Sequence, residues 1–188
     1  DSCPQQLAGP NLGSELIAHG LSFTGYSESM PAAGFTGCDD GTADQLYARK
    51  HNPWVDFADV PVASNQPFTS FPADFSQLPT VAFVVPNQLH DMHSGSVAEA
   101  DTWLRQNVGG YAQWALTHNS LLIVTWDEDD GSDANHIPTL FVGAHVQVGE
   151  YAETINHYDV LRTIESQEGV SFTNEAAHAT TIADVWQG

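Results

Sequence analysis

The sequence has few basic side chains. Its 188 residues include four Lys and Arg against 24 Asp and Glu, for a net charge of −20. A charge of this sign repels phosphate backbones and anionic membrane surfaces, so nucleic acid is excluded as a partner. Long apolar runs are also missing: the longest, 81–85 and 121–124, are far shorter than the roughly 20 residues of a membrane helix. The sequence therefore predicts no transmembrane segment.

Cysteine is nearly absent, since Cys3 and Cys38 are the only two. This number is too small for a structural zinc site built on thiolates, which is therefore excluded. Each lies in a loop-like setting rich in Pro or Gly, which predicts a disulfide worth about 3–4 kcal/mol in the chain-entropy model. A disulfide implies an oxidising compartment and a secreted, extracellular or periplasmic protein. Two unpaired thiols in a reducing cytosol are the alternative.

Three short apolar runs, 80–85, 120–126 and 137–142, each lead into polar residues. Continuous apolar character at strand length is typical of strands buried on both faces of a parallel sheet. Ligands bind beyond the carboxyl ends of such strands, where two of these runs are followed by clusters of His and carboxylate. The sequence therefore predicts an α/β fold in a single domain, 1–188.

Helical periodicity is clearest between the first two runs. Apolar residues recur at steps of three and four over 97–115, Ser96 and Glu99 form a capping box, and the Gly109-Gly110 pair is expected to kink or split the helix. Two further helices are predicted at 159–168, capped by Gly169, and at 14–19, stopped by Gly20, with long loops over 30–80.

The segment Asp127–Asp133 packs five carboxylates into seven residues directly after an apolar run. Like charges held so close cost free energy unless a cation lies among them. An EF-hand is excluded, because Gly131 at loop position 6 would place Trp126 at position 1 and Ile137 at position 12. The position after a strand favours a metal site; a solvated acidic loop is the alternative.

His90, Asp91 and His93 offer three possible ligands in four residues after another run. Carboxylate and imidazole without a nearby Cys suit zinc, iron or manganese better than magnesium. His157 precedes a predicted helix and could also be presented at the edge of the sheet. Five other histidines are expected at surface or core positions without a ligand role: His19, His118, His136, His145 and His178.

The segment Arg49–Pro53 contains two of the four basic residues, next to His51. In so acidic a chain it is the place where a small anion would find a local positive field and several donors. A phosphate pocket is one interpretation. A charged turn ahead of Pro53 is the other.

Taken together, these residues resemble the bacterial phosphoesterase family of secreted acid phosphatases and phospholipases C, within the alkaline phosphatase superfamily. The resemblance implies a three-layer α/β/α sandwich with a mostly parallel central sheet. The matching strings occur in the family's order at 25–28, 47–54, 84–87 with 91–93, 121–128 and 156–165.

The resemblance also implies a catalytic centre built on a divalent metal ion, with Zn, Fe, Mn and Ca as the candidates. Asp127 and Glu128 fall on the acidic pair that binds the metal after a central strand. Asp91 and His93 fall on the Asp/His position of the same centre, and His157 falls on its late histidine.

Substrate contact is implied for His51, which falls on a residue touching the phosphoryl group, with Lys50 beside it. Either His93 or His157 is the candidate proton donor to the leaving alkoxide. The expected activity is hydrolysis of phosphoric esters, of the acid phosphatase or phospholipase C type. The expected substrate is a small phosphoester or a phospholipid headgroup.

One part of the family pattern has no counterpart here. Family members begin with a strand ending in an acidic residue and Asn that bind metal, followed by a Ser or Thr nucleophile. We therefore expect the chain to be the C-terminal portion of the fold, with the nucleophile on a companion N-terminal chain; Ser94 is the first candidate if it is not. The alternative function is a non-catalytic fragment or assembly protein that retains the fold.

Overall fold

The computed structural model describes residues 2–187, which divide into two compact units. The first unit combines the chain up to Thr102 with Asn156–Thr181, and the second combines Trp103–Ile155 with the C-terminal part from Ile182. Over this part of the chain, no helix is both long enough and apolar enough to cross a membrane.

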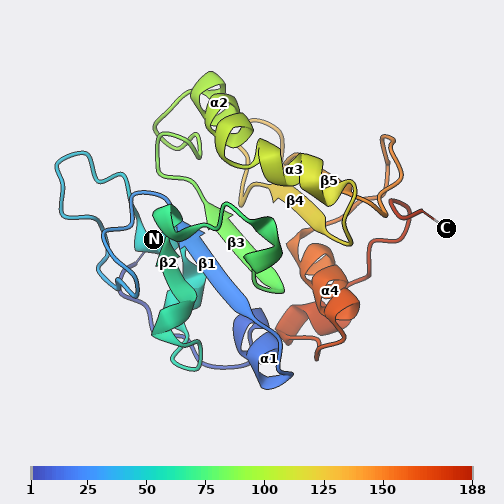
Figure 1. Cartoon of the computed structure of the whole chain (residues 1–188), viewed down its shortest axis with the longest axis horizontal. Helices are drawn as coiled ribbons and strands as arrows, with labels where there is room; N and C mark the ends of the chain where they lie inside the picture. The colour runs from blue at the N-terminus through green and yellow to red at the C-terminus, as the bar shows by residue number, and fades with distance from the viewer. Residues whose placement is uncertain (1, 188) are drawn as a thin grey trace. The chain divides into compact units, whose positions relative to one another are not determined.

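A three-stranded parallel sheet forms the centre of the first unit (Figure 1). Its order is β2-β1-β3, with β1 at Phe23–Ser27, β2 at Asn65–Pro67 and β3 at Val81–Val85. The register pairs Ser27 with Pro67 on one side and with Val85 on the other. The carboxyl ends of all three strands therefore lie at the same edge of the sheet.

The central strand β1 was not predicted as a strand, whereas β3 falls on the predicted run at 80–85. Four of the five residues of β1 are buried, and Gly25 interrupts their apolar pattern. A Cβ at Gly25 would overlap the ring of Trp54, so the strand needs glycine there to let the indole pack on its face. A packing requirement of this kind cannot be seen from hydrophobic periodicity.

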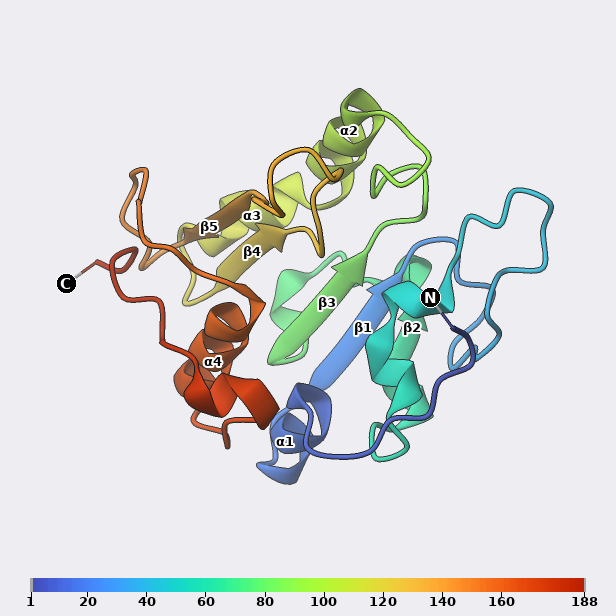
Figure 2. The ribbon, with the colours of Figure 1, turned by 180° about the vertical axis from the view of Figure 1, so that it is seen from behind.

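Two helices of the first unit, α1 (Leu12–Ala18) and α4 (His157–Glu168), agree with the predicted ones and lie side by side in Figure 2. The side chain of Asn156 caps α4, and Asp159 completes a capping box. The helix ends at Gly169, whose left-handed backbone (φ +67°) is the conformation that favours glycine at this position.

The core of the first unit forms where α1 and α4 meet the sheet. Leu16 of α1 is fully buried, and Leu161 and Ile164 of α4 pack against the same cluster. Burial of such side chains stabilises a fold by roughly 1.5–3 kcal/mol each. The buried members of the cluster are Leu12, Leu16, Phe23, Trp54, Val60 and Val170.

The stretch predicted as long loops over 30–80 is mostly irregular, as expected, but it also contains β2. A disulfide joins Cys3 to Cys38, as the sequence predicts, and ties the N-terminal segment to this stretch. The chain also forms short 3-10 helices at Arg49–His51, Pro53–Asp56, Val62–Ser64, Phe68–Ser70 and Phe75–Gln77, with a sixth at Asn174–His178.

The helix predicted over 97–115 is split into α2 (Val97–Asn107) and α3 (Gly109–Ala115), as the paired glycines suggested. At its start the Ser96 backbone N–H donates to the Glu99 carboxylate at 2.8 Å, and the Glu99 N–H donates to Ser96 Oγ at 3.3 Å. This reciprocal pair is the predicted capping box.

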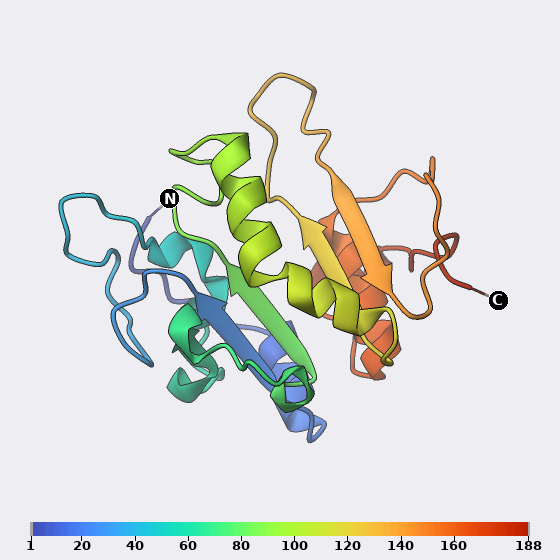
Figure 3. The same cartoon turned by 45° about the horizontal axis from the view of Figure 1, so that its top comes forward.

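In the second unit, β4 (Leu121–Thr125) pairs with β5 (Thr139–Gly143), and α3 packs on both strands (Figure 3). The two strands are antiparallel, and this corrects the expectation that these apolar runs are strands of a parallel sheet. The connection 126–138 contains no helix, and a parallel return needs a crossover that is usually helical. The architecture is therefore mixed α/β.

Candidate functional site

The carboxyl edge of β1 and β3 is closed by Glu28, the residue after β1. Its N–H donates to the Val85 carbonyl at 2.9 Å, and its Oε2 accepts the N–H of Asn87 at 2.9 Å. Asn87 is buried, and its Nδ2 donates to Ser29 Oγ at 3.0 Å. These bonds fix the position where the chain leaves β3.

The loop 87–95 is held by hydrogen bonds within it. The N–H groups of Leu89 and His90 donate to Asn87 Oδ1 at 3.0 and 3.3 Å, and the Ser94 N–H donates to the Gln88 carbonyl at 2.8 Å. A Cβ at Gly95 would overlap the Leu89 carbonyl oxygen. The loop therefore presents its side chains from a defined backbone.

Two residues of this loop, His90 and Asp91, each form a carboxylate–imidazole pair with a residue outside it. Oε2 of Glu28 is 2.8 Å from Nδ1 of His90, and Oδ2 of Asp91 is 3.3 Å from Nδ1 of His51. The ring of His93 has its centroid 6.2 Å from that of His51, while its backbone N–H donates to Asp91 Oδ1 at 2.8 Å. The structure thus brings together three predicted site residues: His51, Asp91 and His93.

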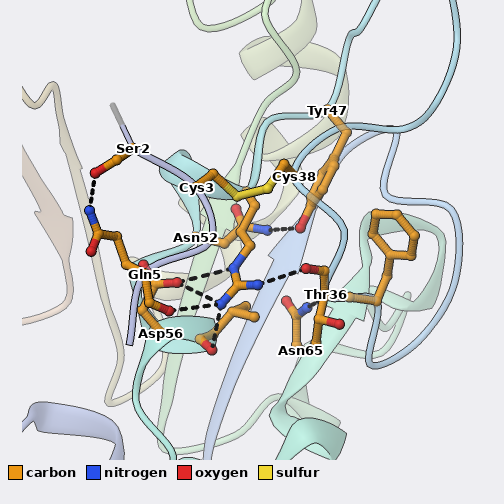
Figure 4. Close-up of polar contacts among 12 residues, drawn as sticks. Ser2, Cys3, Gln5, Thr36, Cys38, Tyr47, Asn52, Asp56 and Asn65 are labelled. Atoms are coloured by element: carbon orange, nitrogen blue, oxygen red, sulfur yellow. Dashed lines mark hydrogen bonds and ion pairs between the residues drawn. A yellow bond between two sulfur atoms is a disulfide. The ribbon is translucent and has the colours of Figure 1, made fainter. Parts of the chain in front are cut away.

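His51 belongs to the 3-10 turn Arg49–His51, which is anchored by Arg49; Figure 4 labels the partners Asp56 and Thr36. Nε and Nη2 of Arg49 both donate to Asp56 Oδ1, at 3.0 and 2.8 Å, and Nη1 donates to the Thr36 carbonyl at 2.7 Å. Arg49 is buried. The phosphate-pocket interpretation is therefore wrong for this guanidinium, because its hydrogen bonds go to the protein.

The other side of the turn is anchored by Asn52, which is fully buried. Its Nδ2 donates to the Tyr47 hydroxyl at 3.1 Å, and burial raises the pKa of that hydroxyl, so it stays neutral at physiological pH. Nearby, Nε1 of Trp54 donates to Asn65 Oδ1 at 2.9 Å. Lys50, between the anchored residues, is exposed and can meet an anion from solvent.

The predicted metal ligands are divided between the two units. Asp91, His93 and His157 belong to the first unit, with His157 exposed as the first residue of α4. Asp127 and Glu128 follow β4 in the second unit and are exposed. Across residues 2–187, no three His, Cys, Asp or Glu side chains form a group that could hold a metal ion.

The acidic loop is partly explained by hydrogen bonds within it. Asp129 accepts the N–H groups of Gly131, Asp133 and Asn135 at 2.7–2.9 Å. These bonds, with that from Asp133 the largest contributor, lower the pKa of Asp129. Asp129 therefore organises the loop as a solvated carboxylate and does not need a cation to do so.

Sequence reasoning missed the roles of Glu28 and Arg49. Glu28 is part of the family-like string 25–28, but the sequence did not show that a strand ends just before it. Arg49 was grouped with Lys50 as a source of positive field, because its partner Asp56 lies seven residues further along the chain, outside the pattern of basic residues.

A parallel sheet with carboxylates and imidazoles paired beyond its carboxyl edge is typical of α/β enzymes that bind ligands at that edge. The family model described as "Phosphoesterase family" matches residues 2–171. The chain therefore belongs to the phosphoesterase family, and the prediction from its motifs is confirmed.

Two curated relatives carry phosphatase names. The chain is 52% identical over 179 residues to the phosphatidylinositol-3-phosphatase of Mycobacterium tuberculosis, covering 94% of this chain and 58% of the relative. It is 26% identical over 167 residues to a probable acid phosphatase of Kluyveromyces lactis, covering 80% and 40%. The chain thus spans about half the length of these relatives. No solved structure matches it.

Proposed function

We propose that the protein hydrolyses phosphate monoesters and that His51, held by Asp91, contacts the phosphoryl group. The observation that carries the proposal is the 3.3 Å pair between His51 Nδ1 and Asp91 Oδ2. Membership of the phosphoesterase family and the phosphatase names of two relatives support it.

The role of Asp91 follows from the geometry of the pair. A carboxylate at Nδ1 favours a proton on that nitrogen and fixes the plane of the ring. Nε2 of His51 is then the ring atom that meets a phosphoryl oxygen. The ammonium group of Lys50, next to His51 in the chain, supplies positive charge for the transferring group.

As the alternative to binding the metal ion, His93 is the proposed proton donor to the leaving alkoxide. Its exposed position suits a group that exchanges protons with water. His157 is the alternative donor. For the attacking hydroxyl we propose a Ser or Thr outside these 188 residues, on the same or a companion chain, with Ser94 as the alternative.

A divalent metal ion remains part of the proposal. Asp91, His93, Asp127, Glu128 and His157 are the proposed ligands, and their carboxylates and imidazoles are donors that Zn²⁺, Fe²⁺ and Mn²⁺ accept, with Ca²⁺ the fourth candidate. When bound, such an ion activates a hydroxyl and neutralises charge on phosphate. No complete cluster of such ligands occurs among residues 2–187.

The first candidate substrate is phosphatidylinositol 3-phosphate, since the relative with 52% identity is named for it. The net charge of −20 opposes approach to an anionic bilayer, which favours headgroups presented in soluble form. A phosphocholine diester, as used by phospholipases C, is the second substrate to test. A secreted or periplasmic location agrees with the disulfide, and the three-layer, mostly parallel architecture of the family is proposed for the whole enzyme.

The test is ester hydrolysis by the whole protein containing these residues, followed as release of inorganic phosphate from the monoesters and of phosphocholine from the diester. Short-chain phosphatidylinositol 3-phosphate, a chromogenic monoester and a phosphocholine diester are supplied in turn, each with Zn²⁺, Fe²⁺, Mn²⁺, Ca²⁺ or chelator. We expect turnover of the monoesters that His51→Gln reduces by roughly 10²-fold or more. Turnover of no substrate with any metal would contradict the proposal and favour the non-catalytic alternative.

A further inference from the structure

Arg49 lies at the meeting point of three separate stretches of chain. Besides Asp56 and Thr36, its Nη2 donates to the carbonyls of Gln5 at 3.2 Å and Val55 at 3.4 Å. The guanidinium thus contacts the N-terminal segment, the 30–48 stretch and the 3-10 helix Pro53–Asp56. Arginine has five N–H donors in a rigid fork, a geometry that lysine cannot reproduce.

The disulfide crosslinks two of the same stretches. Gln5 lies two residues after Cys3, and Thr36 lies two residues before Cys38, so the guanidinium and the disulfide bridge the same pair of segments (Figure 4). The backbone N–H of Arg49 also donates to the Cys38 carbonyl at 2.9 Å. The half-cystine is therefore hydrogen bonded to the turn that carries His51.

The turn itself transmits this anchoring to His51. The His51 N–H donates to the Ala48 carbonyl at 3.1 Å, and the Asn52 N–H donates to the Arg49 carbonyl at 2.8 Å. His51 lies between Arg49, with its several fixed donors, and the fully buried Asn52. A displacement of Arg49 therefore moves the His51 ring relative to Asp91.

We propose that Arg49, together with the Cys3–Cys38 disulfide, is a positioning element that holds His51 against Asp91 for phosphoester hydrolysis. This inference rests on the proposed function, because it gives His51 a role in turnover. A shift of about 1 Å in a group that contacts the reacting centre can cost as much as 10²-fold in rate. The effect of losing Arg49 is therefore expected in turnover more than in substrate binding.

The test uses the whole protein and five variants. Arg49→Lys keeps the charge but loses the fork, and the double variant Cys3→Ser/Cys38→Ser loses the disulfide. The others are His51→Gln, the Arg49→Lys/His51→Gln combination, and Arg105→Lys as the matched control. Arg105 is an exposed residue of α2. For each variant, kcat and KM for a chromogenic phosphate monoester are measured well below its melting temperature. The His51 ring resonances are recorded by NMR, assigned by their loss in His51→Gln.

We expect kcat to fall about 10- to 100-fold in Arg49→Lys, with KM changed less than threefold. The double cysteine variant should lose turnover in the same direction. The His51 resonances should move in both variants and stay unchanged in Arg105→Lys. Combined with His51→Gln, Arg49→Lys should cause no further loss of kcat, since both act through one ring.

Unchanged His51 resonances together with an unchanged kcat in folded Arg49→Lys would overturn the inference. A loss of kcat in Arg49→Lys that adds fully to the loss in His51→Gln would also overturn it, because Arg49 would then act through a group other than His51. If Arg49→Lys does not fold, the double cysteine variant decides by the same readouts. Failure of the proposed function is seen separately, as full activity in His51→Gln; the NMR shifts test the positioning contact without reference to activity.

Discussion

Oε2 of Glu28 lies 2.8 Å from Nδ1 of His90, and the same oxygen accepts the N–H of the buried Asn87 at 2.9 Å. One carboxylate oxygen thus joins the end of β1 to the loop that follows β3. Because this loop carries Asp91 and His93, Glu28 supports the candidate site without belonging to its set of reacting groups.

Glu28→Ala should destabilise the fold by about 1–3 kcal/mol, because the Asn87 N–H is left without its acceptor. Activity should fall as well, since the backbone of the loop that carries Asp91 loses its tie to β1. Urea denaturation and monoester turnover measure the two effects. Glu153→Ala, a change at an exposed position, is the control, and equal stability of the two variants would show that the Glu28 bonds contribute nothing.

Gly95→Ala should be destabilising by about 1–3 kcal/mol, the usual cost of overpacking. The added Cβ overlaps the Leu89 carbonyl oxygen, so the loop must deform where it carries Asp91 and His93. Gly109→Ala is the matched control, because a Cβ there meets nothing within 4 Å, and it should be neutral or stabilising by about 0.5–1 kcal/mol. Thermal melts and turnover of both variants test this contrast, which a neutral Gly95→Ala would refute.

Stability should depend on pH through Glu165. This side chain is fully buried and accepts the hydroxyl of Thr173 at 2.6 Å, and desolvation raises its pKa in the fold. The folded chain therefore holds this proton more tightly than the unfolded chain. The stability it contributes is fully present below the unfolded pKa of about 4.3 and is lost as pH rises through the folded value.

Glu165→Gln removes that titration, so the Tm of the variant relative to the wild type should increase between about pH 4 and pH 7. The Gln Oε1 can still accept from Thr173, and any pH-independent cost of the new amide shifts both ends of the curve equally. Glu153→Gln is the exposed control. A Tm difference between Glu165→Gln and wild type that is constant with pH would refute the account of this carboxyl.

Turnover of anionic substrates should rise with salt. The net charge of −20 repels phosphate esters, and raising ionic strength to 0.15 M shortens the Debye length to about 8 Å, which screens that field more than short contacts at His51. The expected result is a higher kcat/KM for a monoester at 0.15 M than at 0.01 M NaCl. A decrease would mean that a local positive field, centred on Lys50, dominates approach.

Much of the local structure follows from the sequence because its signals are local. The cap at Ser96, the break at Gly109 and the stop at Gly169 depend on residues a few positions apart, and each has the predicted structure. The strand runs that became β3, β4 and β5 were also found, because continuous apolar character marks them. Strand direction is not set by such local signals, so the sequence did not reveal that β4 and β5 are antiparallel.

The residues of the candidate site could be predicted from the sequence, but fewer of the contacts that hold them could be. His51, Asp91 and His93 were chosen from the sequence, and they lie together in the first unit. The inward direction of Arg49 was not visible, because its main partner, Asp56, lies on the next 3-10 turn, outside the pattern of basic residues. The metal role of Asp127 and Glu128 stays a prediction.

The measurement that tests the central claim most directly is kcat/KM for a phosphate monoester in Asp91→Asn, His51→Gln and the double variant. The control is Asp101→Asn, at an exposed residue of α2. If Asp91 acts by holding His51, each single change should cost roughly 10²-fold or more, and the double variant should be no worse than the poorer single one. Full activity in His51→Gln, or losses in the two single variants that multiply in the double, would contradict the account.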